Sequence, residues 1–333
     1  MTLAQAVAAA MFVGIVLYSL FGGADFGSGF YDLTAGSAEE GGELRVLIDH
    51  SIGPVWEANH VWLIYILVIW WTGFPSAFAA ATTTLMLPLA LALLGIVLRG
   101  ASFAFRKYSS TLGQARLFGV LFATSSLITP FFLGAVAGAV ASGRVPANGH
   151  GAVLSSWLHP TSLFGGVIAV GTCAFLAGTF LTADALRAGH ETLSEKLRIR
   201  TLAVGVVTGI VVFAALLPIK HDAPTLSDRL LGVASPLIVL SAVAGTTTLA
   251  LIARRRYAVA RLSAVIAVAS VVLGWGVAQY PWLLVDEVSI KAGAGASATL
   301  VGLLVVIAIA VVVVVPALVY LFWLTQTERW TEA

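Results

Sequence analysis

Nine long apolar stretches dominate this chain of 333 residues. A helix needs about 20 apolar residues to cross the roughly 30 Å hydrocarbon core of a bilayer. Only 10% of the residues are charged and the mean hydropathy is +0.98, whereas soluble domains carry about 25% charged residues. The sequence therefore predicts an all-α polytopic membrane protein with nine transmembrane helices and short loops. The helices are expected at about residues 4–26, 55–74, 77–98, 115–141, 158–182, 201–219, 231–253, 259–280 and 298–324.

Lysines and arginines are divided unevenly between the two sides of the membrane. Of the 18, 14 lie on the side that the chain reaches after odd-numbered helices, while Arg144, Lys220, Arg229 and Lys291 lie on the other. Basic loops stay in the cytoplasm, so we expect the N-terminus outside and the C-terminus inside a bacterial plasma membrane. The net charge of +2 gives no indication of nucleic-acid binding.

A weak internal repeat suggests how the helices are grouped. Arg99 and Arg106 recur 155 residues later as Arg254 and Arg261. This spacing predicts two four-helix units, 1-142 and 155-281, followed by a ninth helix at 297-326. Chance agreement between short basic loops is the alternative.

A polar cluster opens the second predicted helix. Trp56, Glu57, Asn59 and His60 lie within two turns, so that these groups are expected to cover one broad side of the helix. Ionisable groups cost a few kcal/mol each in a membrane helix, so we expect a use for them. Glu-x-x-His is also half of a di-iron carboxylate site, but the rest of such a site is missing and no metal site is predicted. His60 is either a hydrogen-bonding core group or a proton carrier.

Two more charged residues lie close to membrane helices. Asp25 is either a carboxylate that meets water or pins a neighbouring helix, or a group that handles protons or faces a cofactor. Arg99 either reaches lipid phosphates at the cytoplasmic rim or pairs with Asp25 or Glu57. Asp184 is expected to be solvated, and Cys173 to be a small core residue.

The histidines give no indication of haem ligation by this chain. A bis-histidine haem needs two imidazoles at similar depth. His60 opens the second helix on the cytoplasmic side, whereas His159 opens the fifth on the outer side. A haem bound wholly by this chain is therefore not expected.

Four stretches together resemble subunit II of the cytochrome bd quinol oxidases. They are Gly23-Ala24-Asp25-Phe26-Gly27-Ser28-Gly29, then Ile52-Gly53-Pro54-Val55-Trp56-Glu57-Ala58-Asn59-His60-Val61-Trp62-Leu63-Ile64, then Phe74-Pro75, then Arg99-Gly100 to Phe105-Arg106. Their order, their spacing and the nine-helix count agree with the family, most strongly over the first 110 residues.

The resemblance implies a heterodimer with a haem-bearing subunit I. That partner would hold haems b and d and the quinol site, and this chain would hold no cofactor. The complex would oxidise quinol, reduce O₂ to water with four electrons, and take its protons from the cytoplasm. Glu57 and Trp62 match positions of the family's proton route, and we add His60 and Asp25 as candidates. Arg99, Asn59 and Trp56 are the expected structural or charge partners.

Two departures put the proton route in question. The family usually has Asp-Gly-Asn followed by Gln or Glu, where this chain has Glu57-Ala58-Asn59-His60, and it usually has a carboxylate where Ala104 stands. We hypothesise that His60 replaces the lost group, since it lies one turn from Glu57.

Two other functions stay open on the sequence, a secondary transporter and a purely structural membrane partner. The choice between ubiquinol and menaquinol, the path of O₂ and the presence of small single-helix accessory subunits also stay open. Membrane lipid is the other expected partner.

Overall fold

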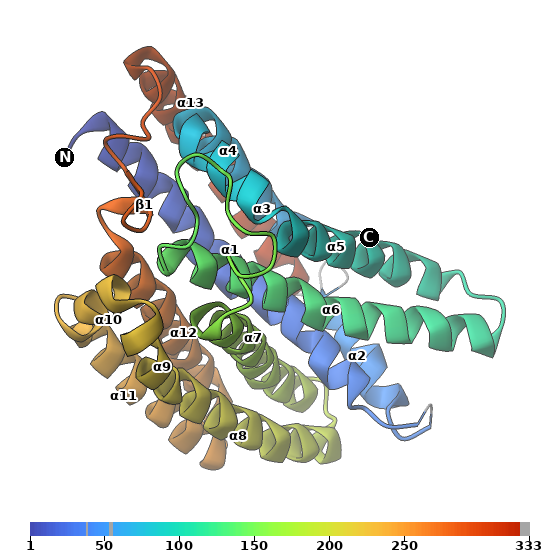
Figure 1. Cartoon of the computed structure of the whole chain (residues 1–333). Coiled ribbons are helices and arrows are strands. Elements are labelled where there is room, and N and C mark those ends of the chain that lie inside the picture. The colour runs from blue at the N-terminus through green and yellow to red at the C-terminus, as the bar shows by residue number, and fades with distance from the viewer. Residues whose placement is uncertain (38, 53–55, 327–333) are drawn as a thin grey trace.

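The computed structural model describes residues 1–37, 39–52 and 56–326, in which the regular structure is helical apart from one short hairpin of strands (Figure 1). Among these described residues, eight helices or helix pairs are each long and apolar enough to cross a membrane, and α2 with α3, which differ in direction by 54°, make a ninth if counted as one span. The fold class predicted from the sequence is therefore confirmed.

The elements follow one another in a simple order. The first half contains α1 (Leu3–Leu33), α2 (Gly42–Ile52), α3 (Trp56–Gly73), α4 (Pro75–Thr84), α5 (Met86–Lys107) and α6 (Leu112–Ala141). The second half contains α7 (Pro160–Arg187), α8 (Glu191–Ala214), α9 (Leu216–Asp222), α10 (Pro224–Leu231), α11 (Ser235–Ala253), α12 (Tyr257–Gln279), β1 (Trp282–Leu284), β2 (Val288–Ser289) and α13 (Ser297–Gln326).

The first helix is longer than predicted. It was expected to end near residue 26, but α1 continues to Leu33 and includes both Asp25 and Asp32 as buried residues. The prediction placed the end of the helix at these acids because acids interrupt an apolar run. In the structure both carboxylates are ion-paired, and the helix continues past them. The helix starts at a capping box, in which the Thr2 hydroxyl accepts a hydrogen bond from the Gln5 amide.

The stretch expected to be a loop after the first helix also contains α2, a short helix of mixed polarity. Residues 53–55, which belong to the string that resembles the oxidase family and include the predicted start of the second span, lie outside the described residues. Arg329, one of the 14 basic residues counted on the expected cytoplasmic side, also lies outside the described residues.

The α3 helix and the α4–α5 pair form an antiparallel hairpin around Phe74. Phe74 is fully buried, and Pro75 begins α4, where a missing backbone N–H costs nothing. The rings of Trp70 and Phe78 lie 5.6 Å apart near this turn, and those of Trp56 and Phe103 lie 5.5 Å apart at the far end. The two arms therefore touch near the turn and again at the far end.

The α1 helix lies at the centre of the bundle, and it contacts α3, α6, α7, α12 and α13 (Figure 1). Glycines allow its closest approach. A Cβ atom on Gly27 would lie 1.9 Å from the carbonyl oxygen of Cys173 on α7, whereas one on Gly23 would meet its nearest atom at 3.5 Å. The backbones of α1 and α7 therefore touch at Gly27, and Cys173 is a buried packing residue.

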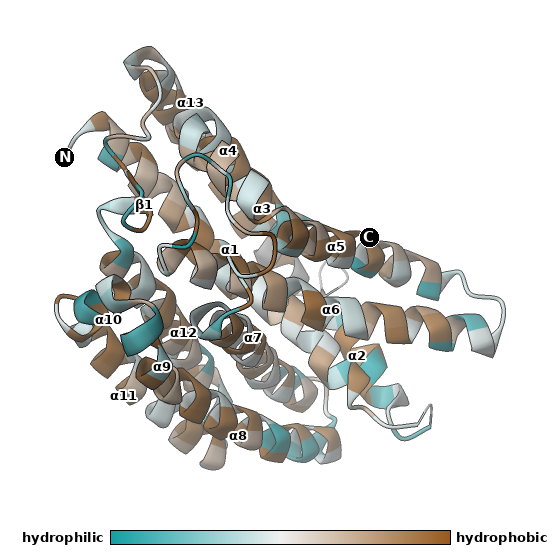
Figure 2. Ribbon diagram, in the orientation of Figure 1, coloured by the Kyte–Doolittle hydropathy of each residue, from teal (hydrophilic) through white to brown (hydrophobic). Residues whose placement is uncertain are grey.

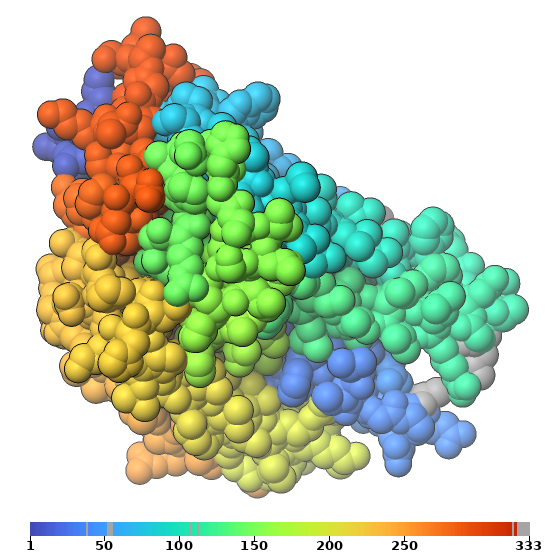
Figure 3. Space-filling model, in the orientation of Figure 1, coloured from blue at the N-terminus to red at the C-terminus, as the bar shows by residue number. Residues whose placement is uncertain are grey.

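The chain between α6 and α7 runs as a long loop over the bundle, beside the β1–β2 hairpin (Figure 3). The Val285 amide donates to the carbonyl of Val140 at 3.2 Å, and the Ala147 amide donates to Glu287 at 3.1 Å. The loop and the hairpin thus cover one end of the helices together.

The division into two four-helix units and a ninth helix stays a prediction. The arginines that suggested it do not occupy equivalent places, because Arg99 and Arg106 both lie on α5, whereas Arg254 follows α11 and Arg261 lies on α12.

The contact at Gly27 yields a test of the packing. We expect Gly27→Ala to lower the free energy of unfolding by about 1 to 3 kcal/mol, because the added methyl group has to push α7 away from α1. The measurement is thermal denaturation of the purified protein. Gly23→Ala is the matched control and should leave the transition unchanged; equal effects of the two variants would contradict the close contact.

Candidate functional site

A buried ion pair lies at the centre of the polar residues predicted from the sequence. Asp25 on α1 is 4% exposed and Arg99 on α5 is 1% exposed. The Nη2 atom of Arg99 donates to Asp25 Oδ1 at 2.5 Å and to the Asp25 carbonyl at 3.3 Å. Arg99 therefore pairs with Asp25 and not with Glu57. The alternative of a rim arginine that reaches lipid phosphates is wrong, because its guanidinium is enclosed by protein.

Neighbouring groups complete the surroundings of Arg99. Its Nε atom donates to Ser126 Oγ at 3.0 Å, and its Cζ atom lies 4.9 Å from the ring centre of Phe26 and 5.0 Å from that of Phe122. Such faces attract a cation, most strongly where water is excluded. Burial of a charge pair is costly unless further polar contacts offset the lost hydration. The serine and the two rings supply these contacts.

A second ion pair repeats the first one two turns away. Asp32 follows Asp25 by seven residues and Arg106 follows Arg99 by seven, so that each pair of residues shares a helix face. Arg106 Nη1 donates to Asp32 Oδ2 at 2.6 Å. Asp32 also accepts from Arg45 on α2 at 2.9 Å, and Arg106 binds Asp49 of α2. The equal spacing of seven residues on the two helices is the signal in the sequence from which this second pair could have been predicted.

Asn59 and His60 lie next to the first ion pair. The hydroxyl of Tyr18 is 3.5 Å from His60 Nδ1, and the rings of Phe26 and His60 are 5.8 Å apart. Asn59 Nδ2 donates to the carbonyl of Phe21 at 3.4 Å. Within the described part of the chain, Asp25 Oδ2 and Asn59 Oδ1 are buried and have no hydrogen-bond partner. The structure thus brings Asp25, Asn59 and His60 together beside Tyr18.

Glu57 lies apart from this group. It is exposed on α3, whereas Asn59 is buried and Trp56 and His60 are half-buried. The polar residues therefore do not share one side of the helix as predicted. Trp62 is half-buried in the core that contains α1, with its ring 6.2 Å from that of Tyr65. Ala104 is exposed on α5.

A different polar network joins the ends of α6, α7 and α9. His159 Nδ1 lies 2.7 Å from Asp222 Oδ2, which also accepts from the Thr161 amide at 2.9 Å. Arg144 pairs with the other oxygen of Asp222, and the hydroxyl of Ser162 lies 3.1 Å from His159 Nε2. No motif in the sequence marks this network, because its partners lie up to 78 residues apart in loops and helix ends.

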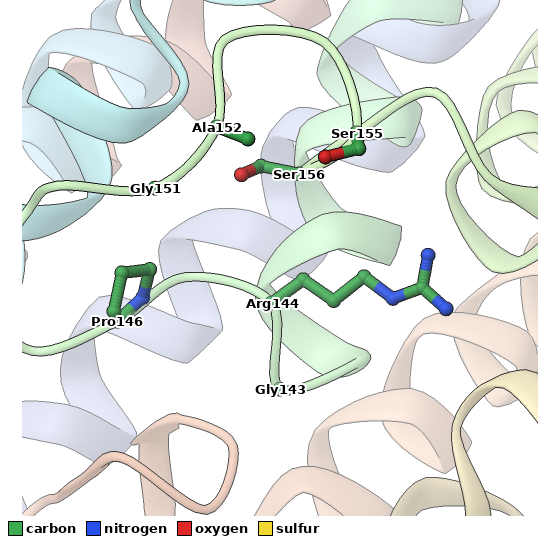
Figure 4. A pocket seen from close by; sticks show the side chains of 7 residues that line it. All are labelled: Gly143, Arg144, Pro146, Gly151, Ala152, Ser155 and Ser156. Carbon is green, nitrogen blue, oxygen red and sulfur yellow. The ribbon is translucent and has the colours of Figure 1, made fainter.

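A cavity of about 470 Å³ lies beside this network, between residues 143–146 and 151–156 (Figure 4). Its lining residues are Gly143, Arg144, Pro146, Gly151, Ala152, Ser155 and Ser156. The single cation of this lining is already bound to Asp222. The cavity therefore offers no free charge to a ligand.

Asp184 is not solvated as expected. It pairs with Arg187 of its own helix and with Arg261 of α12, whose guanidinium lies 5.1 Å from the ring centre of Phe180. The ion pair of Asp184 with Arg261 connects α7 to α12.

No group of three His, Cys, Asp or Glu side chains that could hold a metal ion occurs among residues 1–37, 39–52 and 56–326. His60 lies on α3 in contact with Tyr18, whereas His159 precedes α7 in contact with Asp222. The absence of a metal or haem from this chain stays a prediction.

The fold and this site define a polytopic α-helical membrane protein whose first and third spans are joined by buried ion pairs. The sequence profile of the family described as cytochrome bd terminal oxidase subunit II matches residues 3–325. The chain belongs to this family.

Relatives with known names agree with this assignment. The chain is 30% identical over 218 residues to cytochrome bd ubiquinol oxidase subunit 2 of Bacillus subtilis. This alignment covers 64% of this chain and 62% of the relative. The chain is also 26% identical over 210 residues to cytochrome bd-I ubiquinol oxidase subunit 2 of Escherichia coli K12. That alignment covers 60% of this chain and 52% of the relative. The alignments thus span between half and two thirds of these relatives.

A solved structure has the same fold. The bd oxidase from Geobacillus thermodenitrificans contains a chain that matches with a TM-score of 0.83 and 23% identity, over 99% of this chain and 100% of that one.

The buried ion pair yields a test of what holds α1 to α5. We expect Arg99→Met to cost about 3 to 5 kcal/mol of stability, because it leaves the Asp25 carboxylate buried without its cation. Replacement of both partners, as in Asp25→Leu with Arg99→Met, should cost less. Thermal denaturation and the yield of folded protein are the measurements. Arg187→Met, which removes a half-exposed arginine, should cost under about 1 kcal/mol; a loss as large as that of Arg99→Met would refute the argument.

Proposed function

We propose that this chain is the haem-free subunit II of a quinol:O₂ oxidoreductase. A partner subunit I would hold haems b and d and oxidise quinol, and the complex would reduce O₂ to water with the four electrons that two quinols supply. The observation that carries this proposal is the family match over residues 3–325. It favours an oxidase subunit over a secondary transporter, and the names of the two relatives support quinol as the substrate.

The exposed face of α3 supports a place for the partner. Glu57, Val61, Ile64, Val68 and Trp71 follow at helical spacing and are all exposed. A carboxylate on a face directed at lipid costs a few kcal/mol, and a protein surface with polar groups removes this cost. We therefore propose that subunit I covers this face and receives protons through Glu57.

The buried cluster supports a role for His60 in the same route. His60 lies one turn from Glu57 on α3 and within 3.5 Å of the Tyr18 hydroxyl. Asp25 Oδ2 and Asn59 Oδ1 are buried acceptors, and ordered water is the usual partner of such groups. We propose that water bound at these oxygens links His60 to the interior. Asp25 itself is engaged by Arg99, so that we assign it a positioning role, while Trp62 packs along the route.

The test of this function uses the complex purified with its partner. It should show haem absorption that belongs to a second polypeptide, and it should consume O₂ when quinol is added. We expect Glu57→Gln to lower O₂ consumption and proton uptake at least about tenfold, because an amide cannot carry a proton, while the haem bands stay unchanged. Glu191→Gln, an exposed glutamate at the start of α8, is the matched control.

Other results would contradict parts of the proposal. A colourless preparation without quinol-dependent O₂ consumption would refute the oxidase function. Full activity of Glu57→Gln would remove Glu57 from the route, and His60→Ala with unchanged turnover and proton uptake would remove His60.

The distribution of charge supports an orientation for the chain in the plasma membrane. We propose an outer N-terminus and a cytoplasmic C-terminus, since basic loops are retained inside. Asn148→Cys and Ser110→Cys place single thiols on exposed residues at the two sides, while Cys173 is buried. A maleimide that cannot cross membranes should label Asn148→Cys in spheroplasts, and Ser110→Cys only after the membrane is opened. The reverse pattern would invert the orientation.

A further inference from the structure

A cavity of about 260 Å³ lies between the segment that leads into α2 and the first turns of α8. Hydrophilic residues gather on α2 and at this end of α8 (Figure 2), and the two helices lie beside the end of α1. The lining residues are Ala35, Glu40, Glu43, Leu44, Leu193, Lys196, Leu197 and Arg200. Leu44, Leu193 and Leu197 are buried and form an apolar floor.

Charges of opposite sign stand on the two walls. Glu40 and Glu43 belong to the α2 side, while Lys196 and Arg200 belong to α8. In the described part of the chain, no ion pair joins Glu40 or Glu43 to Lys196 or Arg200, and the contact between the two sides is that of Glu43 with His190, which precedes α8. The two acids and the two basic side chains therefore line the same cavity without pairing with one another.

Three of these four charged groups have other partners nearby. Glu43 lies 2.5 Å from His190, and Glu40 accepts from the Ser37 hydroxyl at 3.2 Å. Arg200 donates to the carbonyl of Thr34 at 3.1 Å. Lys196 has no ion-pair partner among the residues that the structure describes. The cavity therefore presents a cationic wall and an anionic wall that are both able to bind a ligand.

We propose that this cavity binds a zwitterionic group of the phosphoethanolamine type, a primary ammonium joined to a phosphate. The phosphate would contact Lys196 and Arg200, and the ammonium would contact Glu40 and Glu43. A purely anionic group would be repelled by the two carboxylates, and a purely cationic one by the two basic side chains. The volume is large enough for a head group but not for a whole lipid. The acyl chains of a bound lipid would therefore extend out of the cavity along the apolar floor.

The location favours a phospholipid as the source of this group. The cavity lies where α1 ends and where the membrane-spanning stretch of α8 begins, which is the level of lipid head groups. Carboxylates also distinguish between two common zwitterions, because a primary ammonium donates hydrogen bonds and a trimethylammonium donates none. Phosphatidylethanolamine should therefore bind better than phosphatidylcholine or phosphatidylglycerol.

The test is native mass spectrometry of the purified complex after exchange into each of these three lipids. The number of retained phosphatidylethanolamine molecules should exceed that of the other two. The double variant Glu40→Gln with Glu43→Gln should lose this preference, while Lys196→Gln should weaken binding of phosphatidylethanolamine about twofold to fivefold, as expected for one partly exposed ion pair. Unchanged haem absorption checks that each variant is assembled.

Matched controls are available in the same chain. Glu39→Gln changes an exposed carboxylate that lies next to Glu40 in sequence but outside the cavity lining, and Lys220→Gln changes an exposed lysine at the other end of α8–α9. Both should keep the preference. If soluble phosphoethanolamine displaces the retained lipid at similar concentrations, the site is supported with a soluble ligand as its source. Equal retention of the three lipids, or a preference unchanged in the double variant, would overturn the proposal.

Discussion

The low polarity of the membrane interior governs this structure more than any other constraint. An ionised side chain there needs an opposite charge and further polar contacts at the same depth. Asp25 and Arg99 meet this need for each other, with Ser126 and two phenylalanine rings around the guanidinium. Asp32 and Arg106 do the same two turns away. Because α1 carries both acids, its position relative to α5 is fixed at two points.

These two pairs also report the direction of the helices. Each arginine follows its acid by 74 residues in the sequence, and such a constant offset requires that α1 and α5 run parallel. Two parallel spans are separated by an odd number of crossings, which agrees with α3 as the second span and α5 within the third. The hairpin between α3 and the α4–α5 pair then follows from the short turn at Phe74.

The spans were predictable and several details were not. Apolar length sets the number of spans, because the bilayer imposes a minimum length on each. The end of α1 was predicted too early, because a carboxylate such as Asp25 indicates the end of a membrane span unless its ion-pair partner is known. In the site, Asp25, Asn59, His60 and Arg99 stood out as polar residues among apolar ones. Ser126 and Tyr18 did not, since such residues are common in membrane helices. The exposure of Glu57 depends on how α3 is rotated against α1, which a pattern of polar residues does not determine.

The sequence separation of the buried ion pairs bears on how the chain is made. The carboxylate of Asp25 is synthesised 74 residues before the guanidinium that it contacts, a delay of roughly 4 to 15 s at ribosomal rates of about 5 to 20 residues per second. During this time the first span carries an acid without its partner. The surroundings of the Asp25 carboxylate are therefore complete only after α5 has been synthesised.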